Sequence, residues 1–353
     1  MTFEALGILH WNEYSDLRPK SFAEVEPEFI AECARVHEES GFDRVLIANS
    51  AHRPDSIPIA TWATAATKSL KMMIAHRPGF IAPTMAARMF AILDRMGEGR
   101  CGIHIITGSD DVEMQADGDF LTKGERYKRS HEYVDVMRKV WSSETPFDYA
   151  GNYYTINGGF AHVRPDGGTI PIFWGGTSEA ALTHGAEVAD VFALPGFGLA
   201  QAGALAGAFQ AKVTRRGRRP DMLISMRVLV ADTERQAWDR AQAMLRALAE
   251  EVVDNGRFLT EPGETRSRAI ERCVKHANTD SMDGRLWSGV TRIPTGRPSL
   301  NCLIGSTDQV FEALMQYHAL GISRFIMSGY EPIADTRMIG EKLVPRLRAA
   351  IAD

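Results

Sequence analysis

Two glycines and two hydroxyl residues stand together at Gly175-Gly176-Thr177-Ser178, between an apolar run and a segment with helical character. Glycines let the backbone approach an anion closely. The first turn of a helix offers unpaired N–H groups and the positive end of the helix dipole. The same residues also suit a tight strand-to-helix turn in which Ser178 caps the helix. The stretch therefore predicts either a phosphate-binding turn or a purely structural one.

A second candidate site lies where the apolar run Cys101–Ile106 ends in the polar segment Thr107–Asp110. Polar residues at the carboxyl end of a barrel strand usually face an active site. His104, in the middle of the run, is either an inward-facing ligand contact or a core histidine with its hydrogen bonds satisfied. Both interpretations stay open from the sequence.

Two further groups carry polar side chains at predicted element ends. In Glu125-Arg126-Tyr127, Glu125 suits the first turn of a helix, whereas Arg126 or Tyr127 could bind a phosphate. His76 and Arg77 follow another apolar run, so they either reach a barrel mouth or form a solvated pair.

Bulk composition excludes several classes of function. The net charge is −5, from 40 basic and 45 acidic residues, which gives no basic surface for nucleic acid or anionic lipid. No stretch approaches membrane-spanning length. No metal-binding, hydrolase-elbow or P-loop motif is present, so no metal site is expected. The 4 cysteines are far apart, which indicates unpaired thiols in a reducing compartment and predicts a cytoplasmic enzyme.

Short apolar runs alternate with longer amphipathic segments along most of the chain. This alternation predicts an α/β fold, a single (β/α)8 barrel of the TIM type. An open doubly wound sheet is the main competitor, but no GxGxxG follows the first strand. The predicted strands are Ala5–His10, Arg44–Ala48, Lys71–Ala75, Cys101–Ile106, Pro171–Trp174, Asp190–Leu194, Leu223–Val230 and Arg324–Met327. The predicted helices are Phe29–Ser40, Ile57–Lys68, Pro83–Met96, Arg126–Ser142, Ser178–Val188, Ala200–Arg216, Glu234–Glu250, Ser306–Leu320 and Met338–Ala349.

Two segments interrupt the alternation. Pro146–Arg164 predicts a loop with short extended pieces. Glu251–Asn301, before the last βα unit, is polar and glycine-containing, and predicts either a mobile lid over the barrel mouth or a surface embellishment. We expect residues 1–353 to form one barrel domain with this insertion.

An ordered series of motifs resembles the bacterial-luciferase-like flavin monooxygenases, and most closely the alkanesulfonate monooxygenase group. The resemblance runs over nearly the whole chain. The matching stretches are Ala82–Arg88, Leu93–Met96, Gly99-Arg100, Ile106–Asp110, Glu125–Tyr127, Trp174–Ser178, Leu286–Val290 and Ser328–Tyr330.

The resemblance implies reduced FMN supplied by a separate NAD(P)H-dependent flavin reductase, molecular oxygen as co-substrate, and a homodimer or homotetramer. It puts the flavin phosphate near Arg126, Tyr127 and the Gly175–Ser178 turn. It also puts Thr107 near the flavin ring and Glu113 at the place of a flavin-contacting acid. His104 stands where related enzymes often carry an asparagine facing the flavin.

The residues that bind substrate in the alkanesulfonate enzymes carry over poorly. Their Arg-x-His on the seventh strand is Ser225 and Arg227 here. Their Tyr-x-His after the eighth strand is Tyr330 and Pro332, so only the tyrosine is retained. A tryptophan after the sixth strand is replaced near Pro195. The resemblance thus predicts the cofactor site better than the substrate site.

The predicted function is an FMNH2- and O2-dependent monooxygenase that cleaves an alkanesulfonate to sulfite and an aldehyde. Fixed positive charge for an anionic substrate would come from Arg227, Arg297 or Arg292. Tyr330 could donate a proton or hydrogen bond, and His10 is a further pocket candidate. One alternative is the same scaffold acting on a sulfone, carbonyl, heterocycle or biosynthetic intermediate. A second is a flavin-binding protein without oxygenase activity.

Overall fold

Eight parallel strands close into a barrel in the computed structural model, which describes residues 3–14, 23–108, 110–214, 219–279, 282–294 and 301–351. Going round the barrel, each strand pairs with the next, and β13 pairs with β1 to close the ring. In that order the strands are β1 (Glu4–Ile8), β2 (Arg44–Ile47), β3 (Lys71–His76), β4 (Cys101–Ile105), β7 (Ile172–Gly175), β8 (Val191–Leu194), β9 (Asp221–Ala231) and β13 (Arg324–Ser328).

The barrel strands are apolar on both faces because both faces are covered. One layer of buried side chains fills the interior, and a larger cluster lies between the strands and the surrounding helices. The interior layer consists of Leu6, Met73, Phe173, Val191, Leu223 and Ile326.

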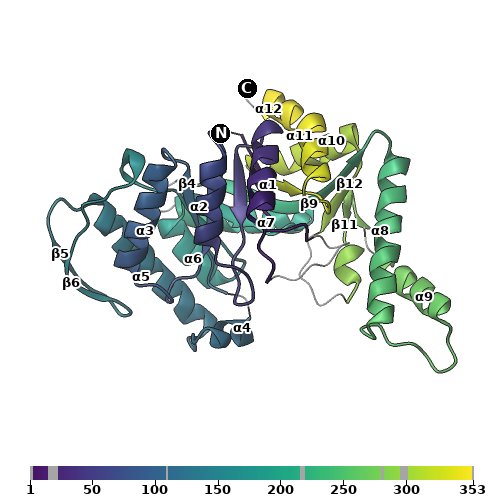
Figure 1. The fold of residues 1–353 in the computed structure, drawn as a ribbon, viewed down its shortest axis with the longest axis horizontal. Coiled ribbons are helices and arrows are strands. Elements are labelled where there is room, and N and C mark those ends of the chain that lie inside the picture. The colour runs from purple at the N-terminus through teal and green to yellow at the C-terminus, as the bar shows by residue number, and fades with distance from the viewer. Residues whose placement is uncertain are drawn as a thin grey trace.

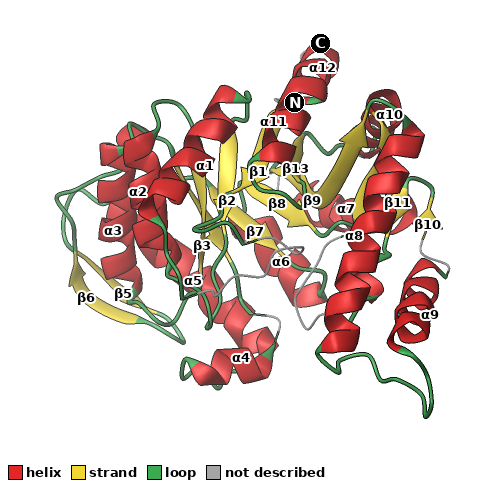
Figure 2. Cartoon of the chain, turned by 45° about the vertical axis from the view of Figure 1, so that its right-hand side comes forward, coloured by secondary structure: helices red, strands yellow, loops and turns green. Residues whose placement is uncertain are grey.

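Helices surround the barrel and lie on its outer face (Figures 1 and 2). The helices that follow barrel strands are α1 (Pro27–Glu39), α2 (Ser56–Ala66), α3 (Pro83–Met96), α4 (Asp111–Ala116), α5 (Lys123–Ser142), α6 (Glu179–Val188), α7 (Leu199–Thr214), α8 (Glu234–Asp254), α11 (Ala334–Lys342) and α12 (Val344–Ile351). Capping matches the sequence where polar residues precede a helix: Thr122 and Glu125 form a capping box at the start of α5.

The predicted closed barrel is confirmed, and the eight predicted strands are the eight barrel strands. Short elements were missed. The region predicted as a loop contains the hairpin β5 (Phe147–Ala150) and β6 (Thr155–Gly159). The short helix α4 and the strand β12 (Cys302–Ser306) were not predicted, because each apolar run is too brief to show a period. The predicted closing helix is two helices, α11 and α12.

The insertion predicted as a lid contains packed structure. Its helix α9 (Arg266–Asn278) lies against α8 and buries Ile270 and Cys273. Strands β10 (Met282–Asp283) and β11 (Leu286–Trp287) pair antiparallel and join β12. That strand pairs with the carboxyl half of β9, which extends beyond the barrel. Figures 1 and 2 show α8 and α9 at the opposite end of the molecule from α3 and α5.

Residues 251–279 and 282–294 therefore pack as a side layer on the barrel. Closure of the insertion over the mouth stays a prediction. Two short helical turns, η1 (Asp166–Gly168) and η2 (Val290–Arg292), and the helix α10 (Thr307–His318) complete the described elements.

The 4 cysteines are buried and form no disulfide, as their spacing predicted. None of the helices in the described parts of the chain is long and apolar enough to cross a membrane.

Candidate active site

A cavity of about 520 Å³ opens at the carboxyl ends of the barrel strands, the end at which active sites of this fold are built. Loops after β2, β3, β4, β7 and β8 supply most of its wall. Its lining residues are Leu46, Asn49, Ser50, Met73, Arg77, His104, Ile105, Ile106, Thr107, Gly108, Glu113, Lys123, Tyr127, Gly175, Gly176, Thr177, Ala193, Leu194, Pro195, Leu223, Ser225 and Ile326.

The Gly175–Ser178 turn joins β7 to α6 along one wall of this cavity. Ser178 is the N-cap of α6, and its hydroxyl accepts from the Ala181 N–H at 3.2 Å, so the capping interpretation is confirmed. Gly176 has a φ of +136°, and a side chain there would run into the Tyr127 hydroxyl and Ala181. Only glycine fits this position, and the turn brings its backbone and the start of α6 to the cavity.

Tyr127 holds the turn from the side of α5. Its hydroxyl donates to the Gly175 carbonyl at 3.3 Å and also interacts with the side chains of Thr107 and Ser178. Burial raises the pKa of Tyr127, so the phenol stays protonated and available as a donor. Four predicted positions (Tyr127, Thr107, Gly175 and Gly176) thus meet at one end of the cavity, with Thr177 beside them.

Lys123 is the lining cation that sequence reasoning missed. It is the first residue of α5 and contributes to the same cavity as the glycine turn. The sequence could have indicated it, because Lys123 comes immediately after Thr122, which caps the helix. The N–H groups of the first turn of a helix have no partner within the helix, so a cation there can join them in binding an anion. Lys123 therefore adds the positive charge that we predicted for Arg126.

Arg126 does not line the cavity, which corrects the prediction that it contacts the phosphate. Its guanidinium is almost fully buried and donates to the carbonyls of Thr107 and Leu121 at 2.7 and 2.6 Å. It also pairs with Asp111 at 2.7 Å. These bonds tie the loop after β4 to α5, so Arg126 positions Thr107 from behind.

His104 lies on the cavity wall, from β4. Its Nδ1 atom is buried and forms no hydrogen bond with any residue in the described ranges. Burial lowers the pKa of His104 to about 4, so the imidazole is neutral at physiological pH. The ring also hydrogen-bonds to the backbone of Phe173. One ring nitrogen of this cavity-lining histidine is thus available to a ligand, and its contact with a ligand stays a prediction.

The opposite wall carries a polar group around Arg77. Its Nε donates to the Asn49 amide oxygen at 3.0 Å, and its guanidinium pairs with Asp117 at 2.5 Å. Glu113 lies 3.9 Å from the same guanidinium and accepts from the Ala51 N–H at 3.0 Å. The structure thus places the predicted acid, Glu113, on the cavity, and Arg77 with it.

His76 does not reach the mouth, although it neighbours Arg77. Its Nε2 is hydrogen-bonded to the Tyr133 hydroxyl at 2.7 Å behind β3, and its ring contacts Phe90. Burial lowers the pKa of His76 to about 4. It is a satisfied core histidine, and strand alternation explains why its neighbour faces the cavity instead.

The residues predicted to act on substrate form a separate group outside the cavity lining. Arg227 donates to the Ser328 hydroxyl at 3.3 Å and to the Gly329 carbonyl, and its guanidinium lies 5.1 Å from the centre of the Tyr330 ring. Tyr330 is buried with Cys302 and Trp287 in the cluster around α8 and α9.

His10 lies close enough to Arg227 to feel its charge. Burial, followed by that charge, lowers the pKa of His10 to about 3. Arg292 donates to the Thr279 carbonyl on the exposed side layer. Arg297 lies outside the described residues. Leu223 and Ser225, which point to the same face of β9 as Arg227, are the β9 residues in the cavity lining.

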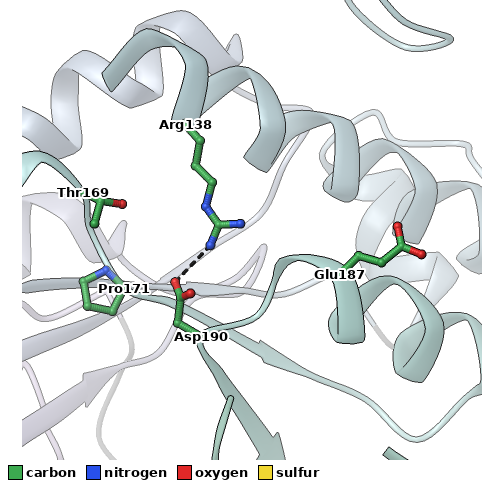
Figure 3. A pocket seen from close by; sticks show the side chains of 5 residues that line it. All are labelled: Arg138, Thr169, Pro171, Glu187 and Asp190. Atoms are coloured by element: carbon green, nitrogen blue, oxygen red, sulfur yellow. Dashed lines mark hydrogen bonds and ion pairs between the residues drawn. The ribbon is translucent and has the colours of Figure 1, made fainter. Parts of the chain in front are cut away.

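Two other hollows lie at the amino end of the barrel. One, of about 450 Å³, has Arg138 facing Asp190 at 3.0 Å, with Glu187 apart on α6 (Figure 3). Arg138 also donates to the Val188 carbonyl, and Asp190 accepts from the Ile172 N–H, so these charges join α5 to the bottom of β7. Among the residues that the structure describes, no group of His, Cys, Asp or Glu side chains could hold a metal ion.

The family of luciferase-like monooxygenases matches residues 10–324, so the chain belongs to that family of oxidoreductases. Solved structures share the fold at low sequence identity. EDTA monooxygenase from Chelativorans sp. BNC1 is 16% identical with a TM-score of 0.75, over 99% of this chain and 94% of that one. The long-chain alkane monooxygenase LadA is 15% identical with a TM-score of 0.77, over 99% and 92%. An F420-dependent secondary alcohol dehydrogenase is 17% identical with a TM-score of 0.70, over 99% and 100%.

Proposed function

We propose that this chain is the oxygenase component of a two-component flavin monooxygenase that uses reduced FMN and O2. The observation that carries the proposal is the glycine turn before α6, which lines one cavity together with Tyr127, Lys123 and apolar side chains from the barrel strands. A phosphate with an attached planar ring system fits such a site. Among the three structures compared above, one is described as F420-dependent, so the choice of FMN is part of the proposal.

The residues of the cavity fit a flavin. Backbone N–H groups at the start of α6, the Tyr127 hydroxyl and the Lys123 ammonium would bind its phosphate. His104 would hydrogen-bond the ring system through its unsatisfied Nδ1, and Glu113 would accept from a ligand N–H. When bound, reduced FMN supplies the two electrons that oxygen activation requires, and a separate NAD(P)H-dependent reductase would supply it.

The chain's own residues would position the ligand and exclude water. Apolar side chains from three strands, Met73, Leu223 and Ile326, line the base of the cavity. Neutral His104 adds a polar contact without a charge that would attract water. A dry site protects a reactive oxygen species from premature decay. Closure of residues 251–301 over the mouth would complete this exclusion.

For the substrate we retain an organosulfur compound of the alkanesulfonate type. One oxygen atom of O2 would enter the carbon that carries sulfur, the C–S bond would break to give sulfite and an aldehyde, and the other oxygen atom would leave as water. Arg227 and Tyr330 could contribute only if the Arg227 contacts with Gly329 and Ser328 rearrange when substrate binds.

A second candidate is the same chemistry on an uncharged substrate. The observation that favours it is charge pairing at the cavity: the guanidinium of Arg77 is matched by Asp117 and Glu113, and Arg227 lies outside the lining. An apolar wall without a free guanidinium suits a neutral carbonyl, sulfone or heterocycle.

One set of assays tests these proposals. The full chain is incubated with FMN and a flavin reductase, and oxygen uptake, peroxide and sulfite are measured over panels of sulfonates and neutral substrates. Sulfite release supports the sulfonate proposal, and oxygenated product without sulfite supports the neutral substrate. Peroxide as the sole product with every substrate would make the chain a non-oxygenating flavin protein. Binding of F420 but not FMN would overturn the cofactor assignment.

We also propose that the chain self-associates through α2 and α3. The helix α2 carries no charged residue, yet Trp62 on its outer face is 54% exposed. Met85, Ile92 and Met96 form an exposed apolar stripe on α3. A helix that is apolar all round is normally covered.

A second copy is the partner that the flanking charges suit. The exposed acids Glu28 and Glu32 lie on α1, on one side of α2, whereas Arg88 and Arg95 lie on α3, on the other. A two-fold axis parallel to α2 would bring the acids of each copy to the arginines of the other. Sedimentation should give a multiple of 39.0 kDa, reduced to the monomer by Trp62→Glu with Ile92→Glu. A wild-type monomer would refute this proposal.

A further inference from the structure

Two histidines join α5 to α6 directly behind the glycine turn. His131 follows Tyr127 by one turn of α5, and His184 stands in the middle of α6. Their Nδ1 atoms are 3.0 Å apart, and their rings meet edge to face with centroids 5.3 Å apart. The two side chains form a hydrogen-bonded clasp between α5, which contributes Lys123 and Tyr127 to the cavity lining, and α6, which begins just after the cavity-lining Gly175–Thr177 segment.

Charged groups surround this clasp on both helices. On α5, Asp135 lies 3.5 Å from His131 Nε2, and Lys128 lies close enough to act on His184. On α6, Glu187 lies 3.5 Å from His131 Nδ1. Asp135 would keep a proton on His131 Nε2, which orients the other nitrogen of that ring toward His184.

The clasp can hold one proton between its two Nδ1 atoms but not two. With one proton between the rings, either ring donates a hydrogen bond to the other. The pair is then either neutral or carries one imidazolium, whose positive charge the carboxylates of Asp135 and Glu187 favour. With two, both facing nitrogens would be donors and two cations would stand 3.0 Å apart. Like charges at this distance repel, so the second proton must separate the rings.

Separation of the rings would reach the phosphate end of the cavity through short connections. The Tyr127 hydroxyl donates to the Gly175 carbonyl at 3.3 Å, so the position of α5 sets where this donor meets the turn. Trp174, just before the turn, donates from its indole nitrogen to the Ala181 carbonyl of α6 at 3.1 Å. The first contact ties α5 to the end of β7 and the second ties α6 to the same strand, so a shift of either helix acts on the turn that follows β7.

We propose that His131 and His184 are positioning residues that hold the first turns of α5 and α6 in register, and that double protonation of the pair weakens flavin binding. This inference rests on the proposed function, because it concerns the same phosphate end of the cavity. Neither histidine lines the cavity, so the pair would act on the ligand through Tyr127 and the Gly175–Ser178 turn.

The direction of the pH effect follows from burial. Burial, and then the neighbouring His131, lower the pKa of His184, with Lys128 acting the same way and Glu187 opposing. A histidine whose folded pKa is lowered stays neutral above its ordinary value of 6.5, so the clasp is complete there. The contribution of the clasp is lost as the pH falls below 6.5 and through the folded pKa.

The test measures the dissociation constant of oxidised FMN from the full chain by fluorescence between pH 8.0 and 5.5. The phosphate of FMN itself titrates near pH 6, so each variant is compared with wild type over the same range. His184→Gln keeps an amide hydrogen bond but cannot titrate, and His162→Gln, at an exposed histidine after β6, is the matched control. We expect the wild-type constant to rise about three- to tenfold more between these pH values than that of His184→Gln. His162→Gln should follow wild type.

A second measurement separates the failure of this inference from the failure of the proposed function. If wild type binds no FMN at pH 8.0, the proposed function fails. NMR titration of the two imidazoles still tests the clasp. The clasp is supported if the two rings are protonated in a coupled way, one at a clearly lower pH than the other, and if His131 titrates in a single step in His184→Gln. Independent titration of the two rings, or equal pH profiles of FMN binding in wild type and His184→Gln, overturns the inference.

Discussion

Charged and polar side chains are arranged differently at the two ends of the barrel. At the amino end, Glu4 pairs with Arg44 at 2.9 Å and with Arg324, which also pairs with Asp221 at 2.7 Å. Basic and acidic groups alternate there, and Arg44 donates to the Met72 carbonyl as well. These residues join β1, β2, β9 and β13 across the bottom of the barrel.

At the carboxyl end, two residues of the cavity lining carry a buried nitrogen without a hydrogen bond in the described part of the chain, although Nη1 of Arg77 lies 3.9 Å from Glu113. Nδ1 of His104 and Nη1 of Arg77 are buried without a hydrogen bond to any residue in the described ranges. Buried polar groups without partners cost free energy that a bound ligand can offset. The amino end also holds such an atom, Nε of Arg324, but the carboxyl-end atoms belong to residues that line the candidate site. We therefore expect the amino-end ion pairs to contribute stability and the carboxyl-end groups to contribute ligand binding.

The largest effect should come from breaking the amino-end network. Glu4→Ala removes the shared acid and leaves the buried Arg44 and the half-buried Arg324 without it, so we expect a loss of roughly 3 kcal/mol in the free energy of unfolding. Urea denaturation measures this loss. The FMN dissociation constant should stay close to wild type, and a change comparable to that of a cavity variant would contradict the division between the two ends.

Acid should destabilise the chain through its buried histidines, two of which, His76 and His104, lie in the carboxyl halves of the barrel strands β3 and β4. Burial lowers the pKa of His76 and of His104 to about 4, so their stabilisation is complete above pH 6.5 and is lost as the pH falls from 6.5 toward 4. Protonation of each histidine lowers the free energy of unfolding by up to roughly 3 kcal/mol at pH 4. Unfolding free energies at pH 7.5 and 5.0 should differ less in His104→Asn than in wild type. An identical difference would show that His104 does not drive the acid sensitivity.

A smaller effect, confined to the ligand, should follow Gly176→Ala. The substitution places a side chain at a φ of +136° and against Tyr127, so we expect FMN binding to weaken by about 1–3 kcal/mol. Fluorescence titration measures the affinity. Gly207→Ala, at an exposed position of α7 with open space around it, is the control and should bind FMN normally. Equal affinities in both variants would rule out the turn as the phosphate site.

The smallest predicted effect distinguishes the two basic residues near that turn. Lys123→Ala should weaken FMN binding by about 1–2 kcal/mol and reduce its dependence on salt, because an exposed ammonium contributes mainly through charge. The matched control is Lys68→Ala, an exposed lysine after α2. Arg126→Ala should instead lower the free energy of unfolding, since Arg126 bonds to loop carbonyls. Loss of binding only in Arg126→Ala at unchanged stability would restore the original phosphate assignment.

Sequence reasoning found the cofactor end of the site more readily than the rest of it. The glycine turn, Thr107 and Tyr127 were predicted because each sits at an element end, where local chemistry indicates the role. Arg227 and Tyr330 were predicted as catalytic, yet they pack beside the side layer. The strand position of Arg227 did not reveal that β9 continues past the barrel and pairs with β12.

The sequence by itself determined the barrel and the turn. Apolar runs buried on both faces, alternating with amphipathic helices, are local patterns set by neighbouring residues and by burial. Tertiary structure decided which polar groups meet. Arg126 turns to the loop after β4 rather than the cavity, and His131 meets His184 across 53 residues. Such partners depend on how loops and helices pack in space, and the period of a sequence carries no information about that packing.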